Sequence, residues 1–180
     1  EYKNQKVFQN FLPFLNNNKI IQKKIKNFVL HKVREIDWCF CIINKKRIKK
    51  KEVLDPNYFM YFETTDLCKE LITKNHKFYV IKNLQFSHLG TSSTKMKYNN
   101  EILVNRNWHF SWSKFYYFKK NNSYFYALRK VLPNIYQNLK GVVISIFKFN
   151  LLEFRLHKAS LSGICNGILL KKSQYRPNIK

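Results

Sequence analysis

Glycine, cysteine and acidic residues are all scarce in this chain, and each shortage narrows the range of folds and functions. The 180 residues include only four Gly, so an all-β fold built on many tight turns is not expected. Asp and Glu number 10 against 34 Lys and Arg, which gives a formal charge of +24 at pH 7. This charge predicts attraction to phosphate groups of nucleic acid, anionic lipid or sugar nucleotides. A compositional bias toward Lys, Asn, Ile, Phe and Tyr would produce the same charge without any selected partner.

Several diagnostic patterns are also missing from the sequence. It contains no internal repeat, no D-x-D, and no phosphate loop of the G-x-G-x-x-G or Walker type. No apolar run reaches the roughly 20 residues that span a bilayer. The chain opens at Glu1 without a secretory signal, and we expect it to be an internal piece of a longer protein. Its four Cys do not have the spacing of a structural zinc site, so we expect free thiols packed in a reducing compartment.

Apolar residues make up 45% and aromatic residues 17% of the chain, which is enough for one domain with a real core. From Lys19 to His31 apolar residues recur at helical spacing, so we predict an N-terminal helix there. Residues 35–44, read EIDWCFCIIN, form a continuous apolar run that is typical of a buried strand. A further strand is predicted at Phe78–Ile81.

The most informative stretch is Asn57–Leu71, read NYFMYFETTDLCKEL, in which an aromatic run leads through Glu63 into an amphipathic helix. Thr64 or Thr65 is a candidate N-cap, and Asp66 could then simply complement the helix N-terminus. Glu63 follows the apolar run and would be partly desolvated. It is therefore a candidate general base or metal ligand, with Asp66 as the second candidate. The residues alone leave the structural and the catalytic interpretations open.

Two other groups of polar residues are candidates for binding phosphate. The loop Ser87–Ser93 is rich in small residues, and its His88 could contact a diphosphate or ligate its metal. Basic side chains also interleave with an aromatic band in the helix predicted over 101–129. That pattern could clamp phosphates or stack bases, and it is also typical of a half-buried helix whose Lys stems cover apolar surface. The basic members are Arg106, His109 and Lys114.

The C-terminal part is basic and helical in pattern. A second helical run is predicted to start at Pro133, and it leads into the apolar stretch Val142–Phe149. Such a basic amphipathic stretch can lie in a membrane surface, and it can equally pack on the domain.

The order of these pieces resembles the C-terminal half of family 2 glycosyltransferases, in particular the bacterial rhamnosyltransferase-like members. The resemblance covers the chain from about Ile36 to its end, and the central block is its most specific part. The residues that carry it are Asp37-Trp38, Tyr58-Phe59-Met60-Tyr61-Phe62-Glu63-x-x-Asp66-Leu67-Cys68, His88-Leu89-Gly90, and Asn107-Trp108-His109 with Trp112-Ser113-Lys114-Phe115.

The resemblance implies an enzyme that transfers a sugar, with inversion, from a nucleotide-diphosphate sugar to a glycan or lipid-linked acceptor. Glu63 and Asp66 are then the candidate catalytic residues. The family usually has a second acid directly after the first, and here that position is Thr64, which cannot act as a general base. His88 is implied to bind the donor diphosphate or its divalent metal, expected to be Mg²⁺ or Mn²⁺. The acceptor-binding residues implied are Trp38 and Tyr61.

We therefore predict an α/β architecture, a partial GT-A-type mixed sheet of few strands followed by a helical, basic C-terminal region. Residues 1–34 would be an N-terminal helical segment left from the donor half, and 35–100 the acceptor-side part of the glycosyltransferase domain. Residues 101–180 would form the C-terminal helical region, which could lie on an anionic membrane surface. The donor half with its D-x-D is expected outside this chain, and the protein in the cytoplasm, peripheral at the inner membrane.

Two alternatives remain. A basic nucleic-acid-binding module would explain the charge and the aromatic residues, but the sequence contains no recognised nucleic-acid-binding motif. A non-catalytic remnant of a glycosyltransferase would explain Thr64 in place of the usual second acid.

Overall fold

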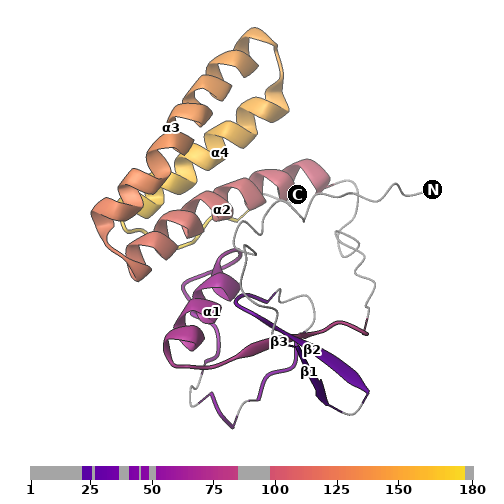
Figure 1. Cartoon of the computed structure of the whole chain (residues 1–180). Coiled ribbons are helices and arrows are strands. Elements are labelled where there is room, and N and C mark those ends of the chain that lie inside the picture. The colour runs from indigo at the N-terminus through magenta and orange to yellow at the C-terminus, as the bar shows by residue number, and fades with distance from the viewer. Residues whose placement is uncertain are drawn as a thin grey trace, which may run out of the picture.

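The computed structural model describes residues 22–25, 27–36, 41–44, 46–48, 52–84 and 98–176. A small sheet and one helix come first along the chain, and three long helices follow (Figure 1). The described chain therefore combines α and β elements and has the predicted helical C-terminal region. The elements are β1 (Gln22–Ile25), β2 (Phe28–Val33), α1 (Glu63–Thr73), β3 (Phe78–Ile81), α2 (Asn99–Asn121), α3 (Tyr124–Phe147) and α4 (Leu151–Ile168).

The three strands form one sheet in the order β1-β2-β3, and both pairings are antiparallel, whereas we predicted a mixed sheet. The N-terminal helix predicted for Lys19–His31 is wrong over its described residues, which form a hairpin. Ile, Val and Phe favour strands, and the pairing of β2 with β3 makes that preference prevail over the helical spacing. The Asn83 side chain stabilises the hairpin, because it accepts a hydrogen bond from the Val29 backbone N–H at 3.1 Å and donates one to the Asn27 carbonyl at 2.6 Å.

The buried strand predicted for 35–44 is also wrong over the residues that the structure describes there. Residues 35–36 and 41–44 have no strand pairing, and the Ile42 side chain is 86% exposed. At these positions the apolar run has no neighbouring strand to pair with. Its composition favours a strand, but composition alone does not show whether a partner strand is present. The strand predicted at Phe78–Ile81 is confirmed as β3, and it pairs with β2.

Helix α1 begins two or three residues earlier than a cap at Thr64 or Thr65 would place it. Its N-cap is Phe62, and neither Thr64 nor Thr65 caps it. The Thr65 hydroxyl instead donates to the Glu35 carboxylate at 2.5 Å, a contact between segments that are distant in sequence. The apolar face predicted for this helix is buried at Leu67, Cys68 and Leu71.

Helices α2, α3 and α4 pack against one another and form most of the core (Figure 1). The aromatic face predicted within 101–129 is buried, because Trp108, Trp112 and Phe115 of α2 face α3 and α4. Two of these rings also form hydrogen bonds to the C-terminal part of the chain. The Trp108 indole donates to the Ser162 hydroxyl at 3.1 Å, and the Trp112 indole donates to the Lys171 carbonyl at 2.9 Å.

The helix predicted to start at Pro133 starts nine residues earlier, at Tyr124, and Pro133 lies inside α3. Ser123 provides the start signal, because its hydroxyl accepts the Tyr126 backbone N–H at 3.2 Å. A proline removes one backbone hydrogen bond, and here the ring lies on an exposed part of the helix, where the loss is tolerated. Among the described helices, none is both long enough and apolar enough to cross a membrane.

Candidate functional site

The segment before α1 has an unusual backbone. Tyr61 and Phe62 both adopt the left-handed conformation, with φ of 67° and 65°. Bulky residues rarely occupy that region, and each costs of order 1–3 kcal/mol, so the surroundings must enforce it. Rings of α2 do so: Phe110 lies 5.6 Å from the Tyr61 ring and 5.4 Å from the Phe62 ring, centroid to centroid. The buried Ser113 hydroxyl adds a hydrogen bond of 2.9 Å to the Met60 carbonyl.

Glu63 follows directly as the first residue of α1. Its side chain is half-buried, and its Oε2 atom is buried without a hydrogen-bond partner in the described part of the chain. An unsatisfied buried carboxylate oxygen costs free energy, and such a group in a folded protein needs an explanation. The strained backbone at Tyr61 and Phe62 also needs an explanation, because strained residues cluster at functional sites.

The surroundings of Glu63 bring three of the predicted site residues together. Burial raises the pKa of the Tyr61 hydroxyl, the Arg106 guanidinium works to lower it, and the Glu63 carboxylate adds to the rise. The Tyr61 hydroxyl therefore lies within electrostatic range of both charged groups. We call Tyr61, Glu63, Arg106 and Phe110 the Glu63 site. It unites one predicted catalytic residue, one predicted acceptor-binding residue and one member of the predicted basic cluster.

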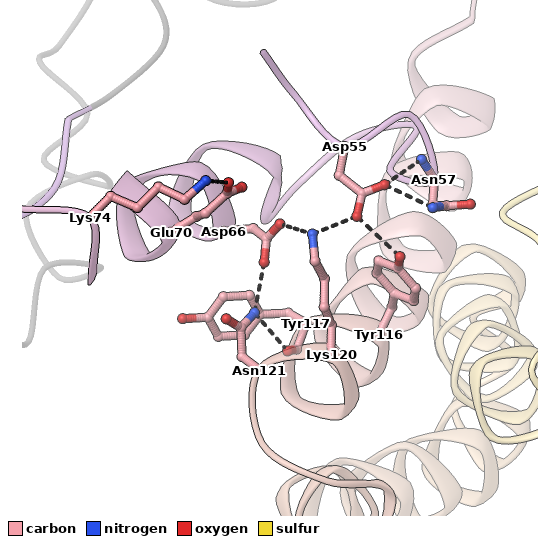
Figure 2. Close-up of polar contacts among 9 residues, drawn as sticks. All are labelled: Asp55, Asn57, Asp66, Glu70, Lys74, Tyr116, Tyr117, Lys120 and Asn121. Atoms are coloured by element: carbon pink, nitrogen blue, oxygen red, sulfur yellow. Dashed lines mark hydrogen bonds and ion pairs between the residues drawn. The ribbon is translucent and has the colours of Figure 1, made fainter. Parts of the chain in front are cut away.

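Asp66 has a different environment from Glu63. Its side chain is buried, and both carboxylate oxygens are occupied: Lys120 Nζ lies 2.5 Å from Oδ2, and Asn121 Nδ2 donates to Oδ1 at 2.7 Å (Figure 2). Lys120 also contacts Asp55, with Nζ 2.6 Å from Oδ2. The carboxylate thus fastens α1 to the end of α2. We call Asp55, Asp66, Lys120 and Asn121 the Lys120 network.

The charges of the Lys120 network reinforce one another. Burial works to raise the pKa of Asp55, but hydrogen bonds from Lys120 and Asn57 outweigh it and lower that pKa below its ordinary value. Burial works to lower the pKa of Lys120, but hydrogen bonds to Asp55 and Asp66 outweigh it and raise the pKa above its ordinary value. Asp55 and Lys120 are therefore both charged at neutral pH, and the role of the network is to hold elements together.

We expect Asp66→Asn to destabilise the chain by about 2 kcal/mol, because it removes one of the two carboxylates that hold Lys120. For a chain of this size that is a fall in melting temperature of roughly 4–8 °C, measurable by circular dichroism. The matched control on the same helix is Glu70→Gln, which breaks a more exposed pair with Lys74 and should change stability by about 0.5 kcal/mol or less. Equal melting temperatures for Asp66→Asn and the wild type would contradict a structural role of this carboxylate.

The members of the predicted basic cluster, Arg106, His109 and Lys114, have separate environments. His109 is fully buried, with its ring nitrogens 2.8 Å from the Ser173 hydroxyl and 3.0 Å from the Tyr175 carbonyl oxygen. Lys114 donates to the Asn134 amide oxygen of α3 at 2.7 Å. Only Arg106 belongs to the Glu63 site. Trp108 and Trp112, which lie between them in the sequence, are packed in the core, so these two rings offer no platform for stacking bases.

The buried His109 predicts how stability depends on pH. Burial lowers the pKa of His109, and the Arg176 charge adds to this, against the hydrogen bond to Tyr175. As the pH falls below the ordinary His pKa of about 6.5, the unfolded chain takes up a proton that the folded chain resists. The free energy of unfolding should therefore fall from pH 7 to pH 5, above the range in which Asp55 titrates.

His109→Gln should remove a large part of that decrease, whereas His76→Gln, at a half-buried position outside the core, should retain it. Denaturant unfolding at the two pH values measures the difference. An unchanged pH dependence in His109→Gln would show that this side chain is not its source.

Trp38 and His88 lie outside the described residues, so the predicted acceptor contact and the predicted diphosphate or metal contact stay predictions. Within the described residues, no three side chains of His, Cys, Asp or Glu lie together in a way that could hold a metal ion. Both oxygens of Asp66 are already occupied by nitrogen donors. The described carboxylates thus do not form the expected Mg²⁺ or Mn²⁺ site by themselves.

The clefts formed by described residues include two near the long helices. A cleft of about 160 Å³ lies between α2, α3 and α4, lined by polar side chains that include Lys114, Asn134 and Asn138. A smaller cleft of about 80 Å³ is lined by Asn57, Trp112 and Lys171 among others. Neither Glu63 nor Asp66 lines either cleft, so the predicted pairing of the two carboxylates at one cavity is not observed there.

Sequence reasoning missed the partners of these residues more than the residues themselves. It did not anticipate Phe110 beside Tyr61, or Lys120 between two carboxylates. The turn at Asp55-Pro56 could be recognised in the sequence. The contacts of Asp55 with Tyr116 and Lys120 could not, because these residues lie 61 and 65 positions later and no local pattern connects them.

Comparison with protein-family models, with curated proteins and with solved structures finds no match for this chain.

Proposed function

We propose that this chain is the acceptor-side part of an inverting glycosyltransferase of the GT-A type, and that Glu63 is its general base. The observation that carries the proposal is the buried Oε2 of Glu63, which has no hydrogen-bond partner among the described residues and lies directly after two left-handed aromatic residues. A carboxylate oxygen without such a partner is suited to accept a proton from a ligand. Asp66 is the weaker candidate, because both of its oxygens are occupied.

In the proposed reaction, the Glu63 carboxylate accepts the proton of an acceptor hydroxyl. The acceptor oxygen forms a bond to the anomeric carbon of the donor. The bond from that carbon to the diphosphate oxygen breaks, and its electron pair leaves with the diphosphate. Attack from the face opposite the leaving group inverts the configuration. General base catalysis of this kind contributes roughly 10²–10⁴-fold to a rate.

The neighbours of Glu63 have supporting roles in this proposal. The Tyr61 ring, held by Phe110, provides an aromatic wall and a hydroxyl for the acceptor sugar. Arg106 provides positive charge for the departing diphosphate. Thr64, at the position where the family usually has a second acid, leaves Glu63 as the proton acceptor. The divalent metal stays part of the proposal, with His88 as its expected contact, and none of these steps depends on it.

The test is a transfer assay with the full-length polypeptide that carries this chain. Labelled nucleotide-diphosphate sugars would be incubated with glycan and lipid-linked acceptors, and the product examined by NMR for the anomeric configuration. We expect transfer with inversion from at least one donor. A product of retained configuration, or no transfer from any donor of the panel, would contradict the proposal. The cytoplasmic, inner-membrane location that we predicted would be tested by fractionating cells that express this polypeptide.

A further inference from the structure

Helix α3 carries apolar side chains on two faces. On its inner face, against α2 and α4, Ala127, Val131 and Ser145 are fully buried, and Leu128 and Ile135 pack beside them partly buried. A second set of large apolar side chains faces solvent and recurs at intervals of three, four or seven residues, so they share one face within an arc of roughly 100°. This outer face consists of Phe125, Leu132, Tyr136, Leu139, Val143 and Ile146, each at least half exposed.

The apolar surface continues around the end of the α3–α4 hairpin. Phe147, Phe149 and Leu151 are 79%, 96% and 71% exposed, and Phe149 has a left-handed backbone with φ of 51°. We call Phe147–Leu151 the hairpin tip. It is the end of the hairpin that points away from α1 and the sheet (Figure 1). A contiguous apolar surface of this kind is rare on a monomer in water and marks an interaction site.

The charges next to this surface identify the kind of partner. Residues 122–152 contain no Asp or Glu, and their four basic residues are all exposed. An apolar face bordered by cationic side chains, with the exposed Glu153 just beyond the hairpin tip, matches the headgroup and upper acyl region of an anionic bilayer. A second copy of the chain would bring like charges together, and a nucleic acid would leave the apolar residues in water. The basic residues are Arg129, Lys130, Lys140 and Lys148.

We propose that the α3–α4 hairpin docks on an anionic lipid surface, with the outer face of α3 in the interfacial plane and the hairpin tip inserted. Helix α3 has 24 residues and a length of about 36 Å, enough to lie along the surface with many contacts. Docking of this kind would place the chain at a membrane surface. This inference stands on the surface of α3 and not on the proposed transfer reaction.

Vesicle flotation of the purified chain tests the inference. Phosphatidylcholine vesicles with and without phosphatidylglycerol would be compared, and no sugar nucleotide is needed. We expect the chain to float with the anionic vesicles, and Phe147→Ser/Phe149→Ser to weaken that partition at least about tenfold. Both positions are almost fully exposed, so the folded chain should retain its circular dichroism spectrum. The matched control is Val80→Ser/Leu84→Ser, which removes exposed apolar residues outside the hairpin and should bind like the wild type.

Three results would overturn the inference. The first is no flotation with anionic vesicles. The second is equal flotation of the hairpin double variant, which would show adsorption through net charge alone. The third is a lipid-free dimer that the hairpin double variant abolishes, because a second copy would then occupy the surface.

Discussion

Glu63→Gln is expected to lower the rate of sugar transfer by the full-length polypeptide by roughly 10²–10⁴-fold, the contribution of a general base. Glutamine keeps the size and shape of the side chain but cannot accept a proton at neutral pH. The change should fall on kcat, because an acceptor hydroxyl can still donate a hydrogen bond to the amide oxygen. The measurement is initial-rate kinetics at saturating donor and acceptor.

Stability should not explain that loss. The Glu63 Oε2 has no hydrogen-bond partner in the described residues, so its replacement breaks no hydrogen bond of that atom to them and removes a partly desolvated charge. We expect the melting temperature of Glu63→Gln to equal or slightly exceed that of the wild type. Glu153→Gln is the matched control, since Glu153 is exposed in the first turn of α4. Full transfer activity in Glu63→Gln would rule out the proposed role.

Gly163→Ala is expected to destabilise the chain by about 2–3 kcal/mol, the largest stability effect that we predict. A Cβ atom at Gly163 would lie 2.3 Å from the Trp108 carbonyl oxygen, and this neighbour is helix backbone that cannot rotate away. Helices α2 and α4 would have to move apart, which loosens the core around Trp108 and Ala159. The cost exceeds the gain of up to about 1 kcal/mol that Ala brings to a helix interior.

One turn further along α4, Gly167 provides a control for the same substitution. There a Cβ atom would lie 3.1 Å from the Phe115 Cβ, a contact that small side-chain shifts can accommodate. Gly167→Ala should therefore change stability by about 1 kcal/mol or less, because the mild crowding and the gain in helix propensity nearly cancel. Urea unfolding of both variants measures the contrast. A smaller loss for Gly163→Ala than for Gly167→Ala would contradict the close approach of α2 and α4.

The parts of the fold that were predictable from the sequence are those determined by local pattern. The helix after Glu63, the strand at Phe78–Ile81 and the buried face of α2 were predicted from apolar periodicity, because each element buries its own apolar face. The hairpin at Gln22–Val33 was not predicted. Its apolar residues also fit a helical spacing, and only pairing with β3, about 50 residues later, selects the strand.

The candidate site was predictable by residue type and not by geometry. Glu63 and Asp66 have the same chemistry and lie three positions apart on α1. They differ only because Lys120 and Asn121 reach Asp66 from a helix that ends more than 50 positions later. The basic residues show the same limit: His109 and Lys114 share a helix with Arg106, but segments remote in sequence bind them. Long-range contacts of this kind leave no periodic signal in one sequence.

The central claim is that the two carboxylates have separate roles, Glu63 in proton transfer and Asp66 in holding α1 to α2. The most direct test compares Glu63→Gln and Asp66→Asn in one experiment, measuring transfer rate per folded molecule and melting temperature. We predict that Glu63→Gln loses the rate at a wild-type melting temperature. Asp66→Asn should lose several degrees of melting temperature at a rate per folded molecule near that of the wild type. The opposite result, in which Asp66→Asn alone loses transfer rate, would contradict the account.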